Sequence, residues 1–254
     1  MKAYFAFTKK EFCEVMRTYK LFIMLTVFLL LGMMNPITAK LTPKIIEEFM
    51  PKGMQITIPE PTALDSWAQF FKNVPQFGLV VLVIVFSGIM SKEFSSGTLI
   101  NMLTKGLHRS VVVISKVTMM ISLWTISYLI CFLVSYAYTS YFWRGQEISN
   151  IFFSVFCLWL FGILLIATMM LGGILIKSSY AVLLFTGSFV MSLFIIDIFP
   201  RIKEYNPIAL ASSNMTLLSK ERLISDFTWP IGISCILIVG FLILAIAIFN
   251  KKAV

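Results

Sequence analysis

The residues that could carry enzymatic chemistry are few and scattered in this sequence. The one histidine is His108, and the four cysteines, Cys13, Cys131, Cys157 and Cys235, form no CxxC pair. A metal site needs several ligands close together, and a serine or cysteine hydrolase needs a basic partner for its nucleophile. No GxxxxGK[ST] or HExxH motif occurs. We therefore expect no catalytic residue, metal site or ATP site in this chain.

Polar residues gather instead in one short segment, residues 91–110, which reads SKEFSSGTLINMLTKGLHRS between two apolar runs. Leu99, Met102 and Leu103 recur at helical spacing and predict an apolar edge. Glu93 could make a charge-assisted contact with a basic residue of a partner protein. These features are typical of a docking helix, although a solvated loop whose basic residues only set the topology has the same composition.

The composition indicates a membrane protein. The 254 residues are 59% hydrophobic and only 13% charged, with a mean hydropathy of +0.91. Six charge-free intervals of 19 to 29 residues cross the chain, and 19 helical residues reach roughly 29 Å, close to the thickness of a hydrocarbon core. We predict an all-α integral membrane protein, a single transmembrane domain over 1–254. Its six transmembrane helices are expected at 21–38, 73–90, 117–142, 151–176, 181–196 and 228–249.

The leader, residues 1–19, predicts a further helix outside the spans. Phe5, Phe12, Met16 and Tyr19 recur at helical spacing, and charged residues fall on another side. This pattern is typical of an amphipathic interfacial helix that lies in the headgroup layer.

Two longer segments, 39–72 and 197–227, are expected outside the membrane on the side opposite the termini. Pro36 should kink or stop the first span, and four prolines between positions 43 and 61 argue against one long helix there. The aromatic cluster Trp67, Phe70 and Phe71 predicts an interface belt around a short helix that leads into the second span.

The distribution of charge predicts the orientation. Six spans put both termini on one side, which also holds twelve basic residues against Glu11, Glu14 and Glu93, whereas the other side holds nine of each sign. The positive-inside rule makes the termini cytoplasmic in a multi-pass cell-membrane protein, such as one of a bacterial plasma membrane. The net charge of +9 then reflects topology and contact with the bilayer and needs no nucleic acid. Membrane-surface anchoring at anionic headgroups is expected from Lys9, Lys10, Arg17, Lys105 and Lys116.

The polar segment and its flanks, KEFSSGTLINMLTKGLHRSVVVISK, resemble the loop of type-2 ABC transporter permeases. That family shows a glutamate, small residues, Gly-Thr, a leucine-rich turn, a Ser/Arg pair and a later lysine. The corresponding positions here are Glu93, Gly97, Thr98, Leu99, Leu103, Arg109, Ser110 and Lys116. The chain departs from the family in having Gly106 where a proline is usual, and in the order of Arg109 and Ser110. YNPIAL, residues 205–210, is similar to an Asn-Pro motif of the same family.

The resemblance implies a permease subunit that works with a separate ABC ATPase, present in two copies, and with a second permease, identical or paralogous. The ATPase subunits would bind ATP and Mg²⁺, and this chain would bind no cofactor. The cytoplasmic segment 91–110 would be a coupling helix that docks in the ATPase. The coupling residues expected are Glu93, Phe94, Gly97, Thr98, Leu99, Met102, Leu103 and Arg109. Short helices in 197–227 would form an external gate that includes Asp197, Asn206 and Pro207.

The expected function is ATP-driven export of a hydrophobic or amphipathic cargo, such as a peptide, a drug or a lipid-like molecule. One alternative is a membrane sensor or immunity protein that binds a partner without transport, and another is an intramembrane enzyme. An ATPase partner would separate the first reading from both, since neither alternative needs one.

Overall fold

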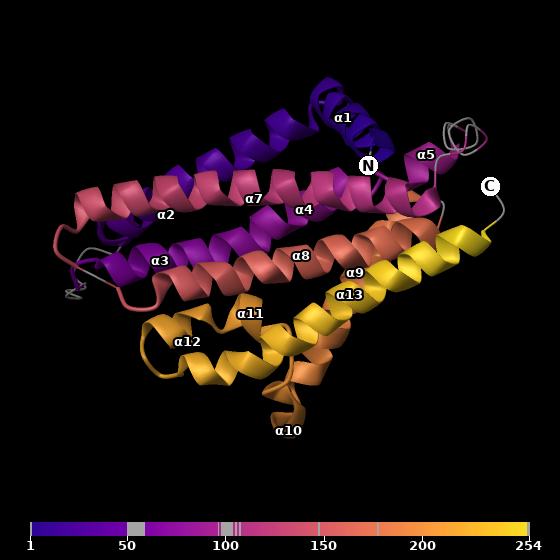
Figure 1. Cartoon of the computed structure of the whole chain (residues 1–254). Helices are drawn as coiled ribbons and strands as arrows, with labels where there is room; N and C mark the ends of the chain where they lie inside the picture. Colours follow the sequence, from indigo (N-terminus) through magenta and orange to yellow (C-terminus); the bar gives the residue numbers. More distant parts are fainter. Residues whose placement is uncertain are drawn as a thin grey trace.

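The apolar runs of the sequence form long helices that lie side by side (Figure 1). The computed structural model describes residues 2–49, 59–95, 97, 104, 106, 108–146, 148–176 and 178–252, and no strand occurs among them. Within this described part, six helices are long and apolar enough to cross a membrane. The predicted all-α fold and the number of candidate spans are therefore confirmed.

The helices follow one another in the chain with these bounds: α1 Lys2–Arg17, α2 Lys20–Phe49, α3 Ala63–Asn73, the π-helix η1 Val74–Gly78, α4 Leu79–Phe86, α5 Ser91–Ser95, α7 Arg109–Phe142, α8 Ile151–Leu175, α9 Ser179–Asp197, α10 Pro200–Lys203, α11 Ala209–Ser212, α12 Asn214–Leu218, the 3-10 helix η2 Ile224–Phe227 and α13 Thr228–Lys251. Both termini lie at the same end of the bundle, beside α5 (Figure 1). We name this the terminal end, and the other the distal end.

The first spanning helix runs further than the sequence suggested. α2 contains both Pro36 and Pro43 and continues to Phe49, so Pro36 does not stop the first span. A proline removes one helical hydrogen bond, but neighbouring helices can compensate within a membrane protein. Here α2 packs along α7: the Ser135 hydroxyl donates to the Gly32 carbonyl at 3.0 Å, and Lys40 Nζ lies 4.0 Å from the centre of the Phe142 ring.

The second spanning unit also begins earlier than predicted. α3, η1 and α4 form one apolar stretch within Ala63–Phe94, and the π-helix falls at Val74–Gly78, around Pro75, which has no N–H to donate. Trp67, Phe70 and Phe71 are buried in the bundle rather than set around it. The predicted interface belt is therefore wrong, because α7 lies beside α3 and its aromatic side chains cover the cluster, as in the contact of Phe70 with Tyr128.

The core of the bundle is α8. In its most apolar window 78% of the residues are buried inside the protein, against 17% in α9 and 11% in α13. Close approach of α7 to α8 depends on Gly162, because a Cβ there would lie 2.4 Å from the Trp124 ring. The uncharged sequence of α8 thus packs against protein on most sides, whereas few residues of α9 and α13 are buried.

The remaining spans agree with the predicted positions apart from their ends. α8 ends one residue before the predicted 176, α9 and α13 run slightly past theirs, and α7 begins at Arg109 rather than at 117. This early start of α7 places Lys116 inside a helix.

Candidate functional site

The root of the polar segment is the five-residue helix α5, which follows α4 at the terminal end. Beyond it the structure describes Gly97, Thr104, Gly106 and His108 before α7 begins, so the predicted coupling residues Thr98, Leu99, Met102 and Leu103 and the predicted anchor Lys105 lie outside the described residues. Gly97 has a φ of +67°, a conformation that glycine adopts without the steric cost of a Cβ.

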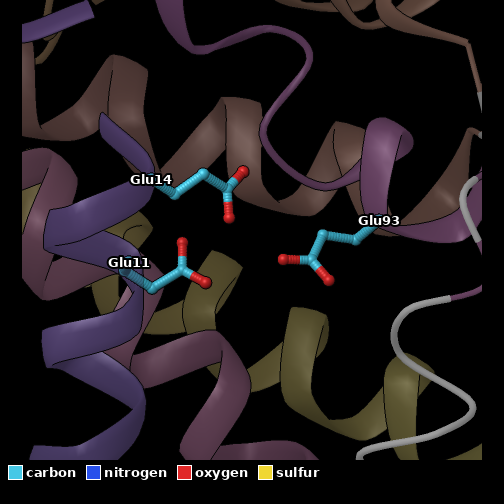
Figure 2. Close-up of side chains that lie close together, drawn as sticks. All are labelled: Glu11, Glu14 and Glu93. Atoms are coloured by element: carbon cyan, nitrogen blue, oxygen red, sulfur yellow. The ribbon is translucent and has the colours of Figure 1, made fainter. Parts of the chain in front are cut away.

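A buried ion cluster joins α5 to α1 and α7. Lys116 of α7 is fully buried, and its Nζ donates to both carboxylate oxygens of Glu11, at 2.9 and 2.8 Å, and to Glu93 Oε1 at 2.9 Å. Glu11 and Glu93 are themselves buried. Figure 2 shows Glu11 and Glu14 on one helix with their carboxylates turned toward Glu93. A single lysine therefore holds residues that are 105 and 23 positions away in the chain.

Lys10 is the second cation of the cluster. Its Nζ lies 2.7 Å from Glu14 Oε2 and 3.0 Å from Glu11 Oε1, and it also pairs with Glu93. Burial lowers the pKa of Lys10, but hydrogen bonds with Glu14 and Glu93 and the charge of Glu11 outweigh burial and raise this pKa above its usual value. Lys10 is therefore protonated at neutral pH.

The cluster is built for ion pairing inside the protein. Oxygens of Glu11, Glu14 and Glu93 lie within 4.8 Å of one another, a spacing that could suit a cation. Two lysine ammonium groups already bind these carboxylates, and the buried Lys20 lies near enough for its charge to interact with Glu11 and Glu14. The described residues therefore bring several cations to these three anions.

Aromatic and capping contacts tie α5 to a fourth helix. Phe94 packs edge-on against Phe249 of α13, with ring centres 5.9 Å apart, and Lys252 Nζ lies 4.9 Å from the Phe94 ring centre. Arg109 donates to the carbonyl oxygens of Phe249 and Lys252, where the end of a helix leaves carbonyls without helical partners. Lys252 in turn donates to the carbonyl of Ile174, at the end of α8.

The structure separates the predicted surface anchors into two groups. Lys9 and Arg17 of α1 are exposed, as the prediction requires. Lys10 is half-buried among carboxylates, and Lys116 has no exposed side chain at all. Headgroup anchoring by Lys116 is therefore wrong, because its charge is compensated by Glu11 and Glu93 within the protein.

Two of the predicted coupling residues are already bound to other residues of the same chain. Glu93 is buried against lysines of the same chain, and Arg109 is occupied at the end of α13. Glu11 was missed as a site residue. The available signal was that Glu11, Glu14 and Glu93 are the three acidic residues on the predicted cytoplasmic side, where basic residues dominate.

The predicted gate residues lie at the distal end, where the chain turns back after the end of α9. Asn206 is buried and donates from Nδ2 to the Leu193 carbonyl at 2.7 Å, and its Oδ1 accepts from the Ile208 N–H at 3.1 Å. Asp197 pairs with Lys203 at 3.4 Å. After the buried Pro207, α11 and α12 pack against α8. Asn206 thus holds the turn that brings these short helices back onto the bundle.

An apolar groove of about 310 Å³ lies between α4, α8 and α9. Leu79, Val83, Phe161 and Val190 are among its lining residues, and Thr186 is the one hydroxyl-bearing residue in the described lining. The groove could accommodate an alkyl chain or an apolar side chain, but its lining has no charged group to bind an ion.

No protein-family model and no curated protein sequence matches this chain.

Proposed function

We propose that this chain is the membrane-spanning permease subunit of an ATP-driven transporter and that it resembles the type-2 ABC permeases. The observation that carries the proposal is the position of the polar segment. It connects two membrane-spanning helices at the terminal end, and its root contacts α1, α7 and α13. The segment is thus linked to three helices by short side-chain contacts, which any movement of the segment must carry along or break.

Energy for such a cycle must come from a partner, since the chain has no P-loop. A separate ATPase, in two copies, docks on the segment 91–110 and supplies ATP and Mg²⁺ chemistry, and a second permease, identical or paralogous, completes the transporter. The polar segment and both termini face the cytoplasm of a cell, as the excess of basic residues on that side favours. Closure of the ATPase then moves α5 and changes how the helix bundle opens.

The cargo class follows from the groove and from the composition. The apolar groove between α4, α8 and α9 suits the alkyl or aromatic part of an amphipathic molecule. Hydrophobic peptides, drugs and lipid-like molecules share that chemistry. The direction of transport is export, which the resemblance supports.

The exposed side of α1 supports a position in the inner headgroup layer. Phe5, Phe12 and Met16 are exposed there, and Lys9 and Arg17 supply positive charge nearby. Apolar side chains with flanking basic residues favour binding at an anionic interface. α1 therefore lies along the membrane surface while its buried side holds Lys116.

The decisive experiment isolates the chain from native membranes and identifies what accompanies it. We expect a P-loop ATPase to co-purify and a hydrophobic cargo to stimulate its ATP hydrolysis in the reconstituted complex. Leu103→Asp should reduce recovery of the ATPase at least about tenfold, since a carboxylate would be desolvated at the apolar edge.

Leu223→Asp is the matched control, because Leu223 is 69% exposed at the distal end. This variant should retain the ATPase. Purification of the wild-type chain without any ATPase, or with a different partner, would favour the sensor or immunity alternative. Hydrolysis of a substrate by the isolated chain would instead favour the intramembrane enzyme.

A further inference from the structure

In the ion cluster at the terminal end, the three carboxylates share Lys10 and Lys116 unevenly. Lys116 Nζ donates to two oxygens of Glu11 but to only one oxygen of Glu93 in these contacts. Lys10 contacts Glu11 and Glu14 as well as Glu93. Without Glu93, two carboxylates of α1 would still face two ammonium groups, and Lys116 would keep a bidentate partner.

Loss of Glu11 has a different consequence. The buried Lys116 would then keep a single oxygen from Glu93 among the contacts described, since Glu14 pairs with Lys10. An incompletely paired charge in a buried position is strongly destabilising. Glu11 is therefore the structural partner of Lys116, and Glu93 is the member that can depart at lower cost.

The helices that carry these carboxylates also differ in how firmly they are held in the bundle. α1 has 16 residues and packs on α7 through buried Phe7 and Val15 and through the hydrogen bond from Tyr4 Oη to Thr118 Oγ1 at 3.1 Å. α5 has five residues, too few to be stable without its tertiary contacts. Movement of α5 therefore costs less packing than movement of α1.

We propose that Glu93 is a latch: α5 releases from Lys10 and Lys116 and carries Glu93 away, while α1 and α7 stay locked together by Glu11, Glu14, Lys10 and Lys116. A competing cation offered to Glu93 triggers the release. Phe94 moves with α5, so its contacts with Phe249 and Lys252 at the end of α13 are broken in the same step.

The identity of the trigger rests on the proposed function: it is a basic side chain of the docked ATPase. The latch itself is a property of this chain alone. Glu93 is thereby assigned two positions, one paired within the bundle and one paired with the partner protein.

The test measures backbone hydrogen–deuterium exchange and thermal unfolding of the purified full chain in lipid nanodiscs. Glu93→Gln should raise exchange in Ser91–Ser95 at least about tenfold, leave exchange in α1 unchanged, and shift the Tm by no more than about 2 °C. Glu11→Gln should lower the Tm by more than about 5 °C and raise exchange in α1. Glu14→Gln is the matched control, and it should leave exchange in α5 at the wild-type level.

Two results would overturn the latch. Equal loosening of α1 and α5 by Glu93→Gln would mean that the cluster is one rigid unit, and unchanged exchange in α5 would mean that other contacts hold it. Each can occur with or without a co-purifying ATPase, so failure of the latch is distinguishable from failure of the permease assignment. Increased exchange in α5 on addition of the ATPase to the wild-type chain would support both proposals.

Discussion

Replacement of Lys116 by methionine tests the physical basis of the charge cluster most directly. Methionine has a similar length but no charge, so the substitution removes the cation while keeping much of the volume. Glu11 and Glu93, both buried, would lose their shared partner, and Lys10 would be the one lysine left in contact with the three carboxylates among the ion pairs described. The cluster would become more negative by one charge in a site with little access to water.

The magnitude follows from the burial of all three groups. Removal of one partner from a buried ion pair costs about 3–5 kcal/mol, because the remaining charge is left uncompensated. Since about 1 kcal/mol corresponds to roughly 2–4 °C in a chain of this size, the Tm of Lys116→Met should fall by about 6–20 °C. The side chains of Lys116, Glu11 and Glu93 are 0%, 1% and 4% exposed, so screening by solvent should not weaken the effect.

A second substitution separates loss of the charge pair from loss of packing. In the double variant Lys116→Met with Glu11→Met, one cation and one anion are removed together, so the net charge of the cluster is that of the wild type. Replacement of a buried ion pair by apolar side chains of similar volume is often neutral or stabilising. We expect the Tm of the double variant to lie within about 4 °C of the wild-type value.

The assay is thermal unfolding in detergent micelles and in nanodiscs, followed by tryptophan fluorescence and by size-exclusion recovery. A fall of less than about 3 °C for the single variant would refute the claim that Lys116 is a buried, paired charge. A double variant as unstable as the single one would show that methionine at position 116 fails to pack, and would refute the electrostatic reasoning.

Two further predictions concern packing and orientation. Gly162→Ala should destabilise the protein by about 1–3 kcal/mol, because its new Cβ would overlap Trp124 in the core. Gly187→Ala is the control: no atom lies within 4 Å of a Cβ built there, so this variant should be neutral or slightly stabilising in the same unfolding assay. Equal effects of the two substitutions would contradict the close approach of α7 and α8. For orientation, a cysteine at Glu221 should react with an impermeant thiol reagent in intact cells, whereas the exposed Cys13 should react only after permeabilisation. The opposite pattern would show that the predicted orientation is wrong.

Much of the fold is predictable from the sequence because the cost of a charge in hydrocarbon is a local property. Intervals without charged residues identify the six long helices, and their even number places both termini at one end. The same reasoning finds the polar segment between the second and third spans. The positions of proline are less reliable guides, because Pro36 and Pro43 do not end α2 and its packing on α7 supports the helix beyond them.

The candidate site shows where local patterns stop being informative. Glu93 was identifiable as a notable carboxylate from its position in the segment, but its partners were not. Likewise, the pattern around Trp67 and Phe70 is the same for an interfacial belt and for a helix face buried against α7.

The sequence alone therefore determined that the chain has six helices long and apolar enough to cross a membrane, and a polar segment at the end where the termini lie. Only the tertiary structure decided that Lys116 is a buried partner of Glu11 and Glu93 rather than a surface anchor. Spans and loops follow from how each residue partitions between water and hydrocarbon, a property that can be read from short stretches of the sequence. A pair separated by 105 positions forms only when the helices pack, and packing depends on the shapes of all of them together.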